Sequence, residues 1–231
     1  MRLPDKVKFL LVLCSGLIFF ISGCVDTSVQ SIPSSFDQRS QVTFVNLVAG
    51  AGDATFTIDG KSVSAGYATE TGMFDIPAGS KNITVNFATG PKTYGFATDV
   101  DAKMRIYFVG TDASSDAVRS TLRQIGGSIA TIADTALVSF FNGSPESTLD
   151  GFTMVEGSDT SEVEFDASVE FGKRSELLQL LPGNYTVISL AYNDSLTASV
   201  STALNVQGNA KYTAVTYDLP SNMKLNVLTD N

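Results

Sequence analysis

Apolar and polar residues alternate in short runs along most of the chain beyond residue 40. Clear examples are Val42–Phe44, Phe56–Ile58, Ile83–Phe87 and Ile106–Phe108, and Gly, Pro, Asn or Asp separates these runs. A period of two residues places alternate side chains on one face of a strand, and the separating residues favour turns. The stretch Val118–Ile132 has apolar residues near helical spacing, but Gly126-Gly127 interrupts it. We interpret it mainly as a strand and a connection, so the pattern predicts an all-β fold.

The same local patterns occur twice and in the same order. The pairs are Val42-Thr-Phe-Val-Asn46 with Val138-Ser-Phe-Phe-Asn142, Ile58-Asp-Gly60 with Val155-Glu-Gly157, Ile76-Pro-Ala-Gly79 before Ile83-Thr-Val85 with Leu181-Pro-Gly183 before Tyr185-Thr-Val187, and Met104-Arg-Ile-Tyr-Phe108 with Ala210-Lys-Tyr-Thr-Ala214. Their spacing, about 100 residues, grows along the chain and indicates an insertion within Ser158–Ala167. A tandem repeat of this length predicts two Ig-like antiparallel β-sandwich domains, residues 41–130 and 131–231.

A proline and a glycine precede a predicted strand in both copies. Pro77 and Pro182 fix φ near −65°, and the glycine that follows each can adopt a positive φ, which suits a tight turn. We interpret both sites as structural turns, with a ligand-binding loop as the alternative.

These matched residues resemble a known family. The first strand ending in Asn, the Asp-Gly or Glu-Gly turn, the Pro-Gly before a Tyr-Thr-Val strand and the later Lys-Tyr-Thr strand are similar to the domain-of-unknown-function family numbered 4397. Asn142-Gly-Ser-Pro145 is the best local match. The resemblance implies extracytoplasmic tandem β-sandwiches and supplies no catalytic residue. The first copy departs from the pattern, because Val45-Asn-Leu-Val-Ala-Gly50 lacks Ser-Pro and Ser80-Lys-Asn82 stands where Tyr is expected.

The N-terminus has the features of a secretory signal. Arg2, Lys6 and Lys8 precede the apolar run Phe9–Ile21, which is shorter than the roughly 20 residues that span a bilayer. Ile21-Ser22-Gly23-Cys24 closes the run and resembles a bacterial lipobox. The resemblance implies cleavage between Gly23 and Cys24, diacylation of the Cys24 thiol and acylation of the new N-terminus with fatty acids such as palmitate. An ordinary cleavable signal is the alternative.

Cys14 is the other cysteine in this region. Bulky Val12 and Leu13 precede it where lipobox processing requires small residues, so we assign it to the discarded signal peptide, residues 1–23.

Residues 24–40 are polar and serine-rich and predict a flexible tether after the acylated cysteine. Val29, Ile32 and Phe36 could instead pack on the first domain. Val25 stands where many Gram-negative proteins carry an aspartate that retains them in the inner membrane. By this resemblance we expect an outer-membrane lipoprotein, facing either the periplasm or the exterior.

Composition excludes several kinds of chemistry. The chain has 2 Cys and 0 His, so loss of Cys14 and acylation of Cys24 would leave no disulfide, thiol metal site or imidazole base. Its net charge is −9, and removal of the basic signal would make it more acidic. Such a chain repels phosphate backbones, so we expect no nucleic-acid partner. We also expect no cofactor.

The catalytic motifs in the sequence are weak. Ser221-Asn-Met-Lys224 matches Ser-x-x-Lys without its companion motifs, and Gly50-Ala-Gly52 lacks the third glycine of a dinucleotide-binding site. Paired carboxylates of a glycosidase remain an alternative, although 0 Trp disfavours a sugar-binding platform. We therefore expect a non-enzymatic protein.

The segment Glu162–Phe171 alternates acidic and apolar residues. Val163, Phe165, Val169 and Phe171 share one face of the predicted strand, and Glu162, Glu164, Asp166 and Glu170 share the other. Such a face is usually solvated, and at a sheet edge it discourages strand addition. A calcium site formed with Glu156 and Asp159 is the alternative, because Ca²⁺ takes six to eight oxygen ligands.

Together these features predict a lipid-anchored envelope module that binds a protein or glycan. A carboxylate-dependent glycan-acting enzyme or a calcium-dependent adhesion module is the alternative.

Overall fold

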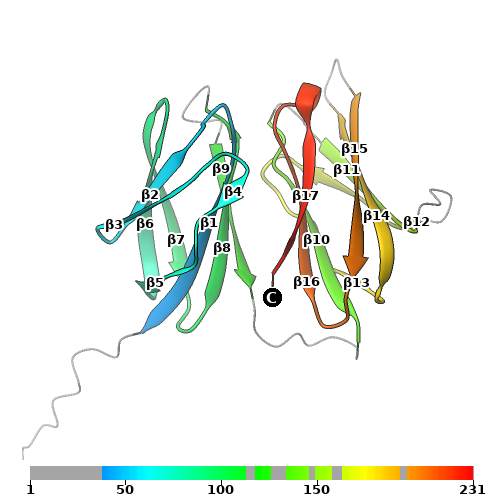
Figure 1. The fold of residues 1–231 in the computed structure, drawn as a ribbon, viewed down its shortest axis with the longest axis horizontal. Coiled ribbons are helices and arrows are strands. Elements are labelled where there is room, and N and C mark those ends of the chain that lie inside the picture. Colours follow the sequence, from blue (N-terminus) through cyan, green and yellow to red (C-terminus); the bar gives the residue numbers. More distant parts are fainter. Residues whose placement is uncertain are drawn as a thin grey trace, which may run out of the picture. The chain divides into compact units, whose positions relative to one another are not determined.

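The computed structural model describes residues 38–112, 118–125, 134–145, 149–157, 163–192 and 197–230. Residues 38–231 form one compact unit, drawn in Figure 1. Apart from the 3-10 turn η2 (Pro220–Asn222), the regular structure of the described residues consists of β-strands. The predicted all-β class is confirmed.

Two sheets form the first half of this unit. One has the order β4 (Thr69–Glu70), β1 (Arg39–Ala49), β8 (Lys103–Thr111) and β9 (Val118–Ile125), with β5 (Phe74–Pro77) also paired with β1. The other has the order β3 (Lys61–Ala65), β2 (Ala54–Ile58), β6 (Gly79–Phe87) and β7 (Gly90–Thr98).

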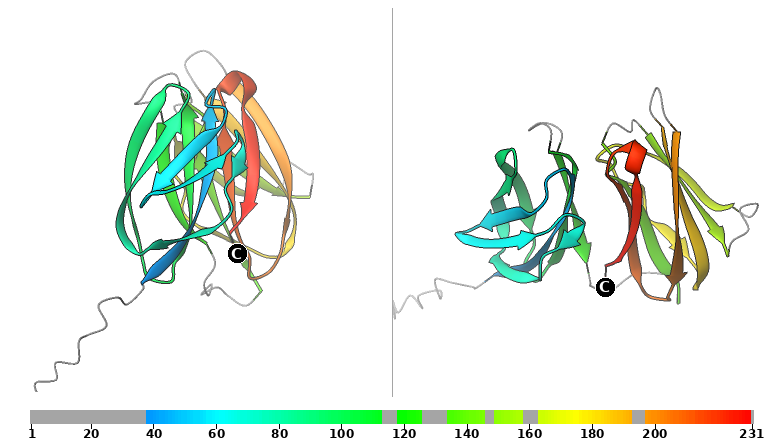
Figure 2. Two further views of the ribbon diagram at one scale, coloured as in Figure 1. Left: turned by 60° about the vertical axis from the view of Figure 1, so that its left-hand side comes forward. Right: turned by 45° about the horizontal axis from the view of Figure 1, so that its top comes forward.

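The second half repeats this arrangement. One sheet has the order β13 (Leu178–Leu180), β10 (Ala136–Asn142), β16 (Lys211–Tyr217) and β17 (Lys224–Thr229). The other has the order β12 (Val163–Glu170), β11 (Leu149–Glu156), β14 (Gly183–Tyr192) and β15 (Thr197–Val206). Figure 2 shows both pairs of sheets from two further directions.

The sequence pattern predicted antiparallel sheets, but two of the sheets also contain a parallel pair of strands. β1 pairs in parallel with β8, and β10 pairs in parallel with β16, whereas the other strand pairs are antiparallel. A parallel pair needs a long crossover between its strands. Here the strands of the other sheet, β2 to β7 or β11 to β15, lie within that crossover.

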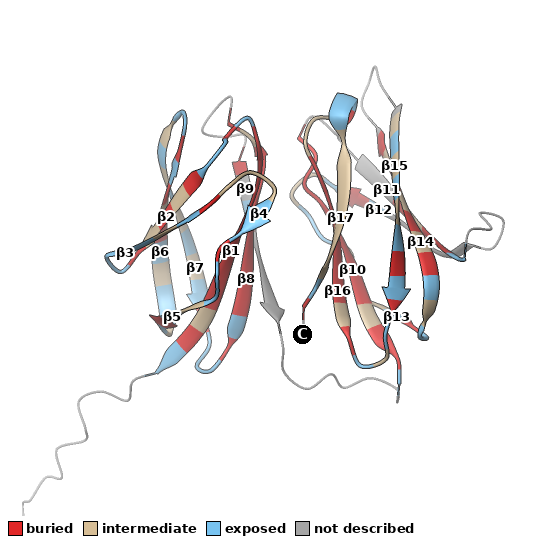
Figure 3. Cartoon of the chain, in the orientation of Figure 1, coloured by how far each residue is buried: buried red, intermediate tan, exposed pale blue. Residues whose placement is uncertain are grey.

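Each half has its own hydrophobic core, visible as buried positions in Figure 3. Phe44 stacks on Phe56 with ring centroids 4.8 Å apart, and Phe140 stacks on Phe152 at 5.0 Å. The alternating positions that predicted the strands of the first half point into its core: Val42, Phe44, Phe56, Ile58, Ile83, Val85, Phe87, Ile106 and Phe108. The strand predicted at the start of Val118–Ile132 is β9, and residues 126–133 lie outside the described part.

Strand register corrects two of the sequence matches. Phe56 pairs with Val85 and the corresponding Phe152 pairs with Ser189, so Val85 corresponds to Ser189, two residues beyond the Val187 of the sequence match. β1 places Val42 opposite Met104, and β10 places Val138 opposite Tyr212. Met104 therefore corresponds to Tyr212, two residues beyond the Ala210 of the sequence match. A shift of two residues leaves the alternation of faces unchanged, so the pattern alone could not detect it.

The two predicted Pro-Gly turns also differ. Gly79 has φ +107°, as the turn requires, but Gly183 lies outside the left-handed region. A side chain at Gly183 would come within 3.2 Å of the Tyr185 ring, so this glycine provides room for that ring.

Independent folding of residues 41–130 and 131–231 as separate domains stays a prediction. The first strand, β1, begins two residues before the predicted boundary, at Arg39.

Candidate functional site

The strands at the centre of the first half are buried on both faces. Met104, Ile106 and Phe108 of β8 face the core, so Arg105 and Tyr107 point to the other side of the sheet. That side would meet solvent in an isolated sandwich, yet Arg105 is only 8% exposed and Tyr107 only 1%.

A third hydrophobic cluster covers this side and joins the two halves. We call it the junction; its buried members are Val45, Leu47, Tyr107, Val109, Phe141, Val215 and Tyr217. The ring of Tyr107 meets that of Phe141 edge-on, with centroids 5.9 Å apart. The near-continuous apolar runs in β1, β8 and β10 indicate burial on both faces, a signal that the sequence reasoning missed.

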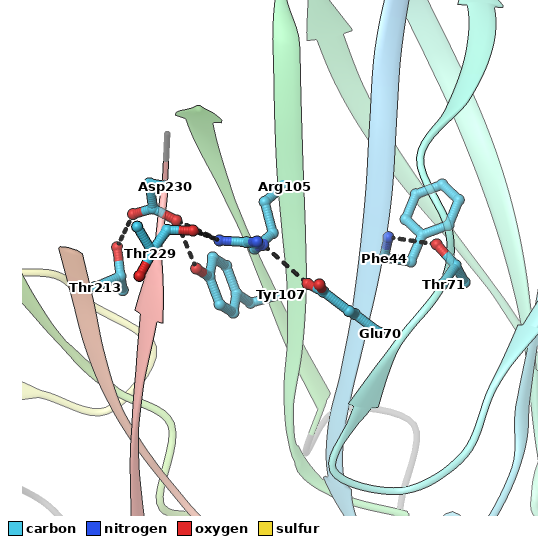
Figure 4. A network of polar contacts seen from close by, with 8 residues as sticks. All are labelled: Phe44, Glu70, Thr71, Arg105, Tyr107, Thr213, Thr229 and Asp230. Atoms are coloured by element: carbon cyan, nitrogen blue, oxygen red, sulfur yellow. Dashed lines mark hydrogen bonds and ion pairs between the residues drawn. The ribbon is translucent and has the colours of Figure 1, made fainter. Parts of the chain in front are cut away.

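A buried ion pair lies in the junction, as Figure 4 shows. Arg105 Nη1 is 2.5 Å from Asp230 Oδ1 and donates a hydrogen bond to the Thr229 carbonyl at 3.0 Å. Arg105 Nε is 3.1 Å from Glu70 Oε2. Asp230 is fully buried, and its second carboxylate oxygen accepts a hydrogen bond from the Thr213 hydroxyl at 2.6 Å. One guanidinium thus connects β4, β8 and the residues that end β17.

The charges in this network are stabilised in place. Burial alone would lower the pKa of Arg105, but Tyr107, Asp230 and Glu70 raise it overall. Burial, reinforced by the negative charge of Asp230, raises the pKa of the Tyr107 hydroxyl well above its usual value. These shifts favour a charged Arg105 guanidinium and a protonated Tyr107 phenol at neutral pH.

A second polar cluster also joins the halves. The Tyr67 hydroxyl donates to Asp218 Oδ2 at 2.8 Å, and Lys224 Nζ lies 3.2 Å from the same oxygen. Lys224 also lies over the rings of Tyr67 and Tyr217, 5.1 and 5.9 Å from their centroids. Burial followed by the hydrogen bond to Asp218 raises the pKa of Tyr67. Burial opposes ionisation of Asp218, but hydrogen bonds from the Leu219 N–H, Tyr67 and Lys224 lower its pKa overall.

This cluster accounts for the Ser-x-x-Lys match. Ser221 lies in η2 and Lys224 begins β17, where its ammonium group contacts Asp218 and two aromatic rings. The lysine therefore pairs with a carboxylate. Gly50 and Gly52 lie in the connection between strands β1 and β2, which is not the strand-to-helix turn of a dinucleotide site.

The repeated asparagine forms the same contacts in both halves. Asn46 Nδ2 donates to the carbonyls of Gly52 and Ala65, and its Oδ1 accepts from the Val48 N–H. Asn142 Nδ2 donates to the Val169 carbonyl, and its Oδ1 accepts from the Ser144 N–H. Each residue is fully buried, and its side chain ties its strand to a strand of the facing sheet, β3 for Asn46 and β12 for Asn142. The motif residue is a structural clamp.

A hydroxyl contact repeats as well. The Thr71 hydroxyl accepts from the Phe44 N–H at 3.0 Å, and the Ser175 hydroxyl accepts from the Phe140 N–H at 2.9 Å. These matched contacts support a structural role for the repeated motifs.

Several predicted site residues fall outside the described part. Gly23, Cys24, Asp159 and Glu162 are not described, and neither are the side chains of Glu164 and Asp166. Glu156 and Glu170 are exposed at the ends of β11 and β12. β12 is an edge strand with Val169 buried and Glu170 exposed, as the alternation predicted. Among the side chains that can be assessed, no group of three His, Cys, Asp or Glu residues could hold a metal ion.

Two shallow depressions lie on the first half. One, of about 350 Å³, lies along β6 and β7 and is lined by Ser80, Lys81, Asn82, Gly95, Phe96 and Ala97. The other, of about 190 Å³, contains Asp75 and Asp101 beside Arg39 and Gln41. Gln41 donates a hydrogen bond to Asp75 at 3.0 Å, and Asp101 occupies a turn with φ +59°. The Asp75 carboxylate and the Asp101 backbone thus take part in local structure.

No family model matches this chain, and no curated protein sequence matches it. Among solved structures, the chain is similar to a candidate cell adhesion protein from Bacteroides eggerthii DSM 20697, with 8% identity and a TM-score of 0.26 over 84% of this chain and 96% of that one. It is also similar to the Bacillus anthracis TIE protein, with 10% identity and a TM-score of 0.28 over 78% of this chain and 33% of that one. Similarities this distant carry no functional argument.

Within the described ranges, no helix has the length and apolar character needed to cross a membrane.

Proposed function

We propose that this chain is a lipid-anchored protein of the bacterial cell envelope that binds or supports a partner and catalyses no reaction. The lipobox-like residues Ile21–Cys24 supply the anchor, and the resemblance to the family numbered 4397 supports an extracytoplasmic location. The residue after Cys24 favours the outer membrane.

The Arg105–Asp230 ion pair is the observation that carries the non-enzymatic part of this proposal. It is buried, paired in good geometry and completed by Glu70, Thr213 and the Thr229 carbonyl. A buried charge that lost its partner would be costly, so this network favours one fixed arrangement of the two halves. This cluster of charged side chains would therefore hold the two halves rigidly together.

Electrostatics also argue against the glycosidase alternative. A glycosidase needs one carboxylic acid with a raised pKa beside a second, ionised carboxylate. The pKa of Asp218 is shifted in the opposite direction, and Asp230 is enclosed against Arg105. Neither carboxylate is suited to protonate a leaving group.

The acidic charge limits the kinds of partner. With a net charge of −9, the chain repels nucleic acids and anionic lipid surfaces, so acyl chains would provide the attachment to the membrane. A neutral glycan or a protein surface that is neutral or basic fits this electrostatic character.

The anchor is tested by metabolic labelling of the full chain with an alkyne fatty acid in a bacterial host that processes lipoproteins. Cys24→Ser should abolish labelling and release the protein from membranes, because Cys24 is the proposed acylation site. Cys14→Ser is the matched control and should retain both properties. Labelling that persists in Cys24→Ser would overturn the anchor.

The non-enzymatic role is tested by cross-linking in whole cells, followed by recovery of the tagged full chain. We expect a defined envelope protein or glycan adduct that is lost when Cys24→Ser releases the chain from its site. Turnover of envelope glycans by the purified protein, abolished by substituting one of its carboxylates, would refute the proposal.

A further inference from the structure

The two halves differ most clearly at one matched pair of edge strands. β7 and β15 occupy the same position, at the end of the sheets β3-β2-β6-β7 and β12-β11-β14-β15. Register relates them residue by residue: Thr84 pairs with Thr93, and its counterpart Ile188 pairs with Ser201. By the same register Pro91 corresponds to Ser199, and Lys92 corresponds to Val200.

β7 carries two residues that discourage pairing with another strand. Proline removes a backbone donor, and lysine opposes burial of the edge. Other edge strands of the described residues are protected by charge or shortness: β3 contains Lys61, β9 contains Arg119 and Arg123, β12 is acidic, β17 contains Lys224, and β13 has 3 residues.

β15 has neither form of protection. Its sequence, TASVSTALNV, contains no charge and no proline, and its ten residues pair with β14 without a register shift. Ser199, Ser201 and Ala203 are exposed on its outer face. The carbonyl of Asn205 accepts a long hydrogen bond, 3.4 Å, from the Tyr212 hydroxyl. No described strand pairs with the outer edge of β15, although β17 and η2 pack close to this strand.

We propose that β15 binds the β15 strand of a second copy of this chain, antiparallel and about a two-fold axis, so that the two β12-β11-β14-β15 sheets become one continuous sheet. A two-fold axis places identical strands side by side, and a strand that carries charge would then bring like charges together. β15 avoids this in every register because it is uncharged.

The acidity of the whole chain favours the same occupant. Two copies with a net charge of −9 repel each other over most of their surfaces. From Gly183 to Tyr192 and from Thr197 to Val206 the β14–β15 hairpin has no charged residue, so repulsion between copies is weakest there. The small side chains of Ser199, Ser201 and Ala203 also allow close approach of a second backbone. The proposal holds whether or not Cys24 carries lipid.

The test uses the full chain in detergent and two matched cysteine variants. Ser201→Cys places a thiol at the centre of β15, and Thr93→Cys places one at the corresponding exposed position of β7. With a short bismaleimide, we expect a cross-linked dimer from Ser201→Cys and none from Thr93→Cys. Cys14 and Cys24 are unchanged in both variants, so any background from these residues is the same.

A second variant transfers the protection of β7 to β15. Ser199→Pro with Val200→Lys should abolish the cross-link and convert the dimer into a monomer in sedimentation equilibrium. Thermal melting of this variant verifies that the fold remains, and Val200→Lys alone serves if the proline prevents folding. Equal cross-linking at Thr93→Cys, a native chain that sediments as a monomer, or a dimer insensitive to both variants would overturn the proposal. Cross-linking of Ser201→Cys to a different envelope protein, without a homodimer, would also overturn it.

Discussion

The guanidinium of Arg105, in β8, lies 2.5 Å from the carboxylate of Asp230, the residue that follows β17, although the two are separated by 125 positions in sequence. Both side chains are buried, with exposed fractions of 10% and 0%. The chain's last described residue thereby fixes a strand of the first half.

Asp230→Ala should therefore destabilise the protein strongly. Removal of one partner leaves the Arg105 charge buried without compensation, which costs about 3–5 kcal/mol. Glu70→Gln is the control, because Glu70 is 43% exposed and its loss should cost about 1 kcal/mol or less. Urea denaturation of the purified variants measures both values. Similar small losses in the two variants would show that the buried pair contributes little.

The raised pKa values of Tyr67 and Tyr107 predict sensitivity to alkali. A tyrosine with a higher pKa in the folded chain stabilises it fully below the unfolded value of 10.0, and this stabilisation is lost as pH rises through the folded value. The free energy of unfolding should thus decline above about pH 10. Tyr107→Phe should reduce the slope of that decline, measured by urea denaturation across the alkaline range. An unchanged slope would contradict burial of the phenol at the junction.

Ser189→Val should stabilise the protein. The Ser189 hydroxyl is fully buried and has no hydrogen-bond partner among the described residues. Register matches it to Val85, because Phe56 pairs with Val85 and the corresponding Phe152 pairs with Ser189. An unsatisfied buried hydroxyl costs about 1–3 kcal/mol, so we expect a gain of similar size in urea denaturation.

The reverse change, Val85→Ser, provides the comparison and should destabilise the first half. If Ser189→Val instead lowered stability, the two cores would not be equivalent at this position.

Gly143→Ala should loosen the junction. A Cβ at this position would lie 2.5 Å from the Thr216 carbonyl oxygen and 2.6 Å from Val109 Cγ1, which belongs to the other half. Overpacking of this kind costs about 1–3 kcal/mol. Gly95→Ala in β7 is the control, because its nearest atom is Asn82 Oδ1 at 3.5 Å. Limited proteolysis and thermal melting should detect a change in the first variant and none in the second.

Sequence alternation predicted the strands well wherever one face meets the core and the other meets solvent. It also found the matched Asn46 and Asn142, because each follows the same alternating run, although β1 continues to Ala49 and β10 ends at Asn142. The residues of the junction escaped prediction for a physical reason. Val45, Tyr107 and Val109 look like extra apolar residues in a strand, and only a covering surface 100 or so residues away makes them a second core.

The polar network was equally hidden from the sequence. Arg105 resembles a solvent-facing residue in a strand, and Asp230 resembles part of a polar end of the chain. Their pairing depends on tertiary structure, for which period and composition give no signal. Turn chemistry was predicted better at Gly79 than at Gly183, since the latter glycine is explained by the nearby Tyr185 ring and not by its own φ.

The parallel pairing of β1 with β8 determines how the fold would respond to mechanical load. A pull on the chain that precedes Arg39 acts along β1, while the hydrogen bonds of β1 to its neighbours lie across that direction. From Gln41 to Ala49 the residues of β1 are matched with Lys103 to Thr111, so these contacts would have to shear together and could not open one by one. Forced unfolding is governed by the unfolding rate, and a shearing arrangement slows it. β1 would therefore resist a load applied through the chain that precedes it.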